Sequence, residues 1–108
     1  LDEALHAAGV ARLSAAPEGV AGRVELRCGD ALALAGEEVT SVGAMYMYMT
    51  MRGMRAIYPW AKAHAAPGTR LITAQFRVTG VDHHEVEEVT YTDARGVDLT
   101  FRFYTYIL

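Results

Sequence analysis

The fold is decided by residues 39–76, which read VTSVGAMYMYMTMRGMRAIYPWAKAHAAPGTRLITAQF. An apolar stretch at Val39–Met49 is followed by a helical pattern at Arg52–Ala66, a Pro67-Gly68-Thr69 break and a second apolar stretch at Arg70–Phe76. A strand, a helix and a strand in this order predict two parallel neighbours with the helix on one face of their sheet. Because Val39–Met49 is so apolar, we expect it to be a strand buried on both faces.

The helical stretch has its own signature. Met54, Ile57 and Ala61 recur at helical spacing, which predicts one buried face. Pro59 lies within the stretch, so the helix is expected either to bend there or to begin near it.

Downstream, two β-rich segments flank a short turn. Residues 86–91 and 97–103 alternate or are rich in β-formers, and Asp93-Ala94-Arg95-Gly96 lies between them. Strands joined by so short a loop are antiparallel neighbours, so a C-terminal hairpin is predicted. Residues 77–85 are expected to be a loop.

Upstream, Asp2–Ser14 has a helical pattern and Arg23–Cys28 alternates at period two, which predicts a strand. The elements together predict an α/β fold in one domain, residues 1–108. Its sheet is expected to be mostly parallel with an antiparallel C-terminal hairpin.

Bulk properties restrict the function classes. The 108 residues carry a formal charge of -3, which argues against nucleic-acid binding driven by phosphate contacts without excluding a nucleic-acid substrate. Cys28 is the single cysteine, so a reducing, cytoplasmic setting is expected. No apolar run reaches the roughly 18 residues of a membrane span, and no signal peptide is expected. Because the chain opens at Leu1 in a helical pattern, we expect a natural start to precede it.

The segment Arg23–Ala31 ends in Gly29-Asp30-Ala31 and resembles the third strand of class I S-adenosylmethionine-dependent methyltransferases. The Pro67-Gly68-Thr69 join is similar to that family's step from fourth helix to fifth strand. The resemblance covers nearly the whole chain and is strongest to small bacterial enzymes that methylate lysine or small molecules. It implies methyl transfer from S-adenosylmethionine to a nitrogen or oxygen nucleophile of a small molecule or protein side chain.

The resemblance also implies a cofactor site. Asp30 would accept the adenine amino group and the backbone N–H of Ala31 would meet a ring nitrogen, a complementary donor and acceptor pair. Asp2 would hold the ribose hydroxyls or would be the second of the family's two acidic positions, with the ribose ligand just before Leu1. The bland alternatives are that Asp30 turns the chain and caps the next segment, and that Asp2 caps a helix.

Substrate contacts are implied at Tyr46, Tyr48, His83 and His84, although no residue stands out as the base. Packing of a period-two Met/Tyr run is the alternative for the two tyrosines. The Asp/Asn-Pro-Pro-Tyr motif of adenine and glutamine methyltransferases is absent. Asp82–Glu85 offers metal-binding side chains, but a solvated loop fits better and no metal is expected. Cys28 is expected to be a small buried hydrophobe.

The chief departure from the family is an absence. The 108 residues contain no Glu/Asp-x-Gly-x-Gly loop, and the first two strands are missing too. In the family's sheet order, 3-2-1-4-5-7-6, those strands fill the centre, so the predicted fold is incomplete. A preceding segment of a longer chain, or a second copy in a homodimer, is expected to fill the gap. An enzyme that uses a nicotinamide dinucleotide would need a Gly-x-Gly-x-x-Gly motif, which the 108 residues also lack. The other alternative is a catalytically inactive Rossmann-like interaction module.

Overall fold

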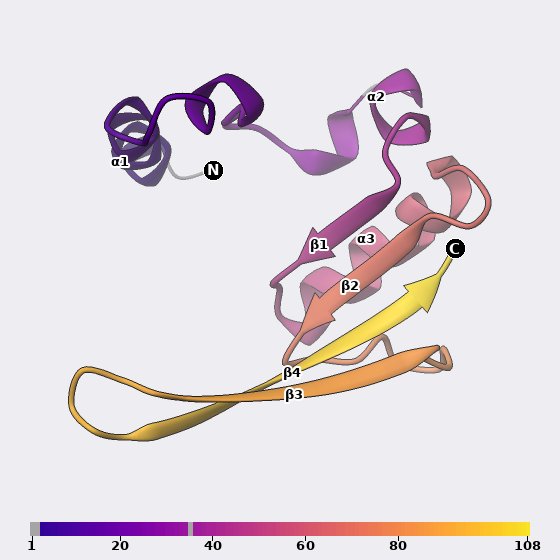
Figure 1. Cartoon of the computed structure of the whole chain (residues 1–108). Helices are drawn as coiled ribbons and strands as arrows, with labels where there is room; N and C mark the ends of the chain where they lie inside the picture. Colours follow the sequence, from indigo (N-terminus) through magenta and orange to yellow (C-terminus); the bar gives the residue numbers. More distant parts are fainter. Residues whose placement is uncertain (1–2, 35) are drawn as a thin grey trace. The chain divides into compact units, whose positions relative to one another are not determined.

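A four-stranded mixed sheet organises residues 36–108 (Figure 1). The strand order is β1-β2-β4-β3, with bounds Ala44–Met47 for β1, Arg70–Ala74 for β2, Glu85–Thr92 for β3 and Asp98–Ile107 for β4. Strands β1 and β2 are parallel, whereas β4 is antiparallel to both β2 and β3. The order reproduces the 4-5-7-6 end of the order that the resemblance implies. The predicted combination of parallel strands and an antiparallel C-terminal hairpin is present as a mixed sheet, in which β1 and β2 form the parallel pair and β4 forms two antiparallel pairs.

The structure, a computed structural model, describes residues 3–34 and 36–108. Its contacts divide the chain into two units, residues 1–34 and 35–108. Within residues 3–34 and 36–108, no helix is long and apolar enough to cross a membrane.

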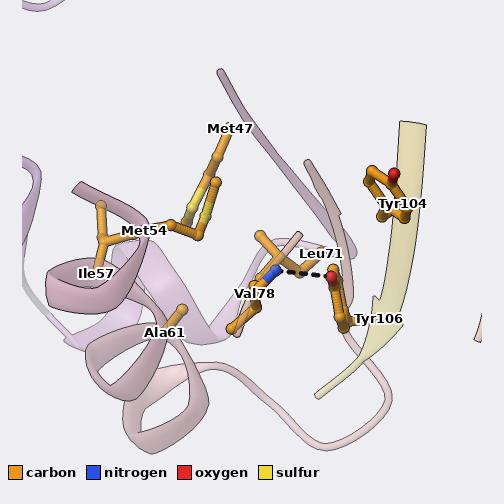
Figure 2. Close-up of a cluster of buried hydrophobic side chains, with 8 residues drawn as sticks. All are labelled: Met47, Met54, Ile57, Ala61, Leu71, Val78, Tyr104 and Tyr106. Carbon is orange, nitrogen blue, oxygen red and sulfur yellow. Dashed lines mark hydrogen bonds between the residues drawn. The ribbon is translucent and has the colours of Figure 1, made fainter. Parts of the chain in front are cut away.

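Helix α3 (Met51–His64) covers one face of the sheet; Figure 1 shows it behind β1 and β2. The predicted side of the helix is the buried one, since Met54, Ile57 and Ala61 are its buried residues. They pack with buried side chains from the strands and the loop after β2 (Figure 2): Met47, Leu71, Val78, Tyr104 and Tyr106. Burial of this apolar surface is the main stabilisation of the unit.

The ends of α3 are set by side chains and by Gly68. Thr50 caps the N-terminus, where its Oγ1 accepts a hydrogen bond from Gly53 N at 3.1 Å. Pro59 lies inside the helix, which begins eight residues earlier at Met51. After the helix, Gly68 adopts φ 86° and turns the chain into β2.

The strand predicted at Val39–Met49 is wrong in extent. Residues Gly36–Thr40 form helix α2, Gly43 lies in a turn, and only Ala44–Met47 pair as β1. Val39 is buried in α2, which packs near α3, so its apolar side chain belongs to a helix and not to a strand. Burial on both faces is also wrong, since Tyr46 is 61% exposed while Met47 is buried. An apolar run cannot by itself distinguish a buried strand from a short buried helix.

The predicted hairpin is confirmed, and β4 extends to Ile107, beyond the predicted end at 103. Asp93 Oδ1 accepts hydrogen bonds from Arg95 N at 2.8 Å and from Val97 N at 3.0 Å, and Gly96 adopts φ 79°. Figure 1 shows the turn end of the hairpin projecting past β1 and β2. The extension arises because residues 103–107 pair with β2 on their other side.

In the N-terminal unit, helix α1 (Glu3–Ser14) is followed by two 3-10 turns, η1 (Ala21–Arg23) and η2 (Ala31–Ala33). The strand predicted at Arg23–Cys28 is not formed: Val24 is extended, but residues 24–28 pair with no strand of the described part. A period-two pattern favours extension, and a strand needs a partner as well. Cys28 is exposed, which corrects its expected burial, because the segment forms no strand within its own unit.

Candidate functional site

The carboxyl ends of β1 and β2 adjoin an open pocket of about 590 Å³. Met51 lines it from the start of α3, Tyr104 from β4, and residues 75–82 from the loop after β2. In open α/β sheets, ligands bind beyond the carboxyl ends of the strands. This is therefore the candidate site of the C-terminal unit, and it is called the loop pocket below.

A second, shallower pocket of about 400 Å³ lies beside it on the hairpin. Its lining consists of Arg77, His83, Val86, Glu88, Arg102 and Tyr104. Arg77 and Tyr104 line both pockets, so the two form adjoining parts of one surface.

The start of the loop is held in a strained conformation. Gln75 has φ 69°, the left-handed region that residues other than glycine rarely occupy. Two hydrogen bonds fix it to β4: Gln75 N donates to Arg102 O at 2.8 Å, and Arg102 N donates to Gln75 Oε1 at 3.1 Å. Strain that several bonds over-determine is concentrated at functional sites.

The next residues are tied to the sheet as well. Thr73 Oγ1 donates to Phe76 O at 2.8 Å. Val78 N donates to the hydroxyl of Tyr106 at 2.8 Å, the bond drawn in Figure 2, and Tyr106 is only 1% exposed. Arg77 therefore lies between two residues that hydrogen bonds fix to β2 and β4.

Of the two arginines that line the second pocket, Arg102 forms an ion pair and Arg77 forms none with the described residues. Arg102 Nε donates to Glu88 Oε1 at 2.7 Å, and this bond, with a smaller effect of Tyr104, raises the pKa of the exposed guanidinium. Arg77 forms no ion pair with any of the residues that the structure describes. Its guanidinium is thus available to an anion in either pocket.

The two predicted histidines lie differently. The ring of His83 packs edge-on to Tyr104, with centroids 5.3 Å apart, and lines the second pocket. His84 is exposed, and its backbone N donates to Thr105 O at 2.7 Å. Among residues 3–34 and 36–108, no group of three or more His, Cys, Asp or Glu side chains could hold a metal ion.

Tyr46 and Tyr48 lie on the sheet face opposite α3. Their neighbours Met45 and Met47 contact the core, and side chains alternate along a strand. The two tyrosines are 61% and 63% exposed and pack against Phe103 and Phe101, with ring centroids 6.5 and 6.4 Å apart. Neither lines the loop pocket, so the structure brings the tyrosines together but not with His83.

In the N-terminal unit, Asp30 caps η2, since its Oδ1 accepts from Leu32 N at 2.9 Å. Ala31 is the first residue of that turn, where a backbone N–H has no acceptor within the helix. Asp2 lies outside the described residues. The cofactor role predicted for these three residues stays a prediction.

Sequence reasoning missed Gln75, Arg77 and Tyr104. Gln75 carries no signal, because nothing marks a glutamine for a left-handed conformation. Arg77 was expected only as part of a loop, and Tyr104 lies just beyond the predicted end of its strand. A Pro- and Gly-poor loop directly after a strand was the available hint to the pocket.

Comparisons with known proteins find a likeness among solved structures. No protein-family model and no curated protein sequence matches the chain. Among solved structures, it is similar to the crystal structure of an RNA methyltransferase from Salinibacter ruber in complex with S-adenosyl-L-homocysteine, with a TM-score of 0.64 and 19% identity. The match covers 82% of this chain and 50% of that enzyme. The chain therefore has a methyltransferase-like α/β fold, over a span that corresponds to half of that enzyme.

Proposed function

We propose that the chain is the C-terminal part of a class I S-adenosylmethionine-dependent methyltransferase, which methylates a nitrogen or oxygen of a small molecule or protein side chain. The observation that carries this proposal is the strand order β1-β2-β4-β3, in which α3 connects the two parallel strands β1 and β2. It corresponds to the 4-5-7-6 end of the class I sheet. The likeness to an RNA methyltransferase supports methyl transfer, while the charge of -3 favours an acceptor other than a polyanion.

Asp30 and Ala31 fit one part of the cofactor, the adenine edge. One carboxylate oxygen of Asp30 accepts from Leu32 N, and a carboxylate has further acceptor positions for an adenine amino group. The N–H of Ala31 is suited to a ring nitrogen. Asp2 remains the candidate for the ribose hydroxyls, and the glycine loop would come from outside these 108 residues.

S-adenosylmethionine, when bound, supplies a methyl group already activated by its sulfonium sulfur. The chain would hold the acceptor next to that methyl group, and the acceptor's proton would leave to a base or to water. The task of the chain is then to orient the acceptor and exclude water. The loop pocket is the candidate acceptor site, and His83, rather than Tyr46 or Tyr48, adjoins it.

The test is calorimetric titration of S-adenosylhomocysteine into this chain and into the longest natural form that contains it. Binding by the longer form is expected, with roughly tenfold or greater weakening in Asp30→Ala, since a hydrogen bond to a carboxylate is lost. Absence of binding by both forms would overturn the methyltransferase proposal and favour an inactive interaction module.

Two variants separate adenine recognition from capping. Asp30→Ser keeps an oxygen that caps η2 but is too short to reach a base, so it is expected to bind as weakly as Asp30→Ala. Glu18→Ala removes the same charge from an exposed position of the same unit and is expected to bind normally. If Asp30→Ser binds as tightly as the parent while Asp30→Ala does not, Asp30 only caps the turn.

A further inference from the structure

We propose that the methyl acceptor is a small carboxylic acid with an apolar body, whose carboxylate is bound by Arg77 at the border of the two pockets. This inference rests on the proposed function, because it assigns the substrate class of that site. It starts from the position of Arg77, which lines both pockets and forms no ion pair with the residues described.

Hydrogen bonds fix the backbone on both sides of Arg77. Its two neighbours are fixed, Phe76 through Thr73 Oγ1 and Val78 through the buried hydroxyl of Tyr106. The left-handed Gln75, bonded twice to Arg102, sets the direction in which the loop leaves β2. A backbone fixed on both sides lowers the entropy that the loop must lose when Arg77 binds an anion. A planar guanidinium also matches a carboxylate with two parallel hydrogen bonds.

The surroundings favour a singly charged anion with an apolar body. Asp82 lines the same pocket, and its negative charge disfavours a dianion such as a phosphate monoester more than a monoanion, whereas Glu88 in the adjoining pocket is paired with Arg102. Val78, Val81 and Tyr104 provide an apolar wall. A volume of about 590 Å³ suits a small molecule.

The inference is tested by NMR titration of the longest natural form with three probes of one shape: benzoate, benzamide and phenyl phosphate. Benzoate is expected to shift the amide signals of Val78 and Val81 and to bind roughly tenfold more tightly than benzamide, because only benzoate carries a charge for Arg77. Phenyl phosphate is expected to bind more weakly than benzoate. Equal binding of benzoate and benzamide, or tighter binding of phenyl phosphate, would overturn the assignment.

Variants identify the residue responsible. Arg77→Gln is expected to erase the preference for benzoate over benzamide, and Arg77→Lys to keep part of it, since a lysine retains charge without the bidentate fork. Arg70→Gln, which removes the same charge from the amino end of β2, is the matched control and is expected to bind like the parent. An equal loss in Arg70→Gln would show a general charge effect and reject the site.

None of these titrations needs S-adenosylmethionine, so the two proposals fail separately. Selective benzoate binding without S-adenosylhomocysteine binding would keep the carboxylate pocket and reject methyl transfer. The reverse result would keep methyl transfer and reject a carboxylic acid as the acceptor.

Discussion

At the scale of single residues, the hydroxyl of Tyr106 joins the loop to the core. Tyr106→Phe keeps the ring but leaves the buried N–H of Val78 without its acceptor. We expect the free energy of unfolding to fall by about 1–3 kcal/mol, measured by urea denaturation. Tyr91→Phe removes a hydroxyl from an exposed ring and is expected to change stability by less than about 0.5 kcal/mol. Equal effects of the two substitutions would contradict this role for the Tyr106 hydroxyl.

At position 75, the usual order of stability, in which an alanine variant is more stable than a glycine variant, is expected to be reversed. Gln75→Ala loses the bond from Arg102 N and retains φ 69°, whereas Gln75→Gly loses the same bond and relieves the strain. Glycine is therefore expected to be more stable than alanine here by about 1 kcal/mol. Thermal unfolding of the two variants measures the difference. Ala63, exposed on α3, is the control, because Ala63→Gly is expected to destabilise the protein in the ordinary direction.

Asp93 makes the hairpin tip sensitive to acid. Hydrogen bonds from Val97 N and from Arg95 lower the pKa of this carboxyl below its ordinary 3.8. Because the folded pKa is the lower one, the stabilisation is complete above about pH 4 and is lost as pH falls through the folded value. The melting temperature is expected to drop more steeply below pH 4 in the parent than in Asp93→Asn. Parallel curves would contradict a stabilising role for the ionised carboxylate.

At the scale of elements, α3 depends on its cap. Thr50→Ala removes the acceptor of Gly53 N and is expected to reduce the free energy of unfolding by about 1 kcal/mol, measured by urea denaturation. Thr50→Ser keeps the oxygen and is expected to restore most of the stability. Because Met51 opens the helix and lines the loop pocket, the same cap fixes one wall of the candidate site.

The hairpin adds the strands β4 and β3 to the sheet beside β2. Residues 103–105 of β4 pair with both β2 and β3, residues 106–107 pair with β2 alone, and residues 98–102 pair with β3 alone. Arg102 belongs to the part of β4 that pairs with β3 alone, and Glu88 is its partner in β3. Both residues line the second pocket. The register therefore decides which hairpin side chains lie next to the loop.

At the scale of the whole molecule, β1 is an end strand of the described sheet. We propose that a preceding segment pairs with β1, as the class I sheet order implies. Amides of residues 44–47 are then expected to exchange with deuterium faster in this chain alone than in its longest natural form, because an edge strand is more readily opened. Exchange at residues 103–105 of β4, which pair with strands on both sides, is expected to be slow in both forms.

Concentration separates the two ways of covering that edge. If protection of residues 44–47 in the chain alone rises with protein concentration, a second copy pairs there, as in a homodimer. Equal exchange in both forms at all concentrations would contradict a partner at this edge.

Several features of this protein are determined by the sequence on its own. The spacing of Met54, Ile57 and Ala61 fixes the buried side of α3, and Asp93–Gly96 fixes the hairpin, because short-range periodicity and turn chemistry act over a few residues. The Pro67-Gly68-Thr69 join likewise marks the start of β2. The order of these elements predicted an α/β fold with a C-terminal hairpin, and the resemblance implied its methyltransferase-like arrangement.

Other features were decided only by tertiary contacts. Residues 24–28 pair with no strand among the residues that the structure describes, and Val39 is buried in a short helix rather than a strand, since pairing and packing depend on distant residues. The left-handed Gln75 exists because Arg102, far along the chain, bonds it twice. The candidate site therefore lies around Arg77 and Tyr104, which only the folding of β4 against the loop brings together.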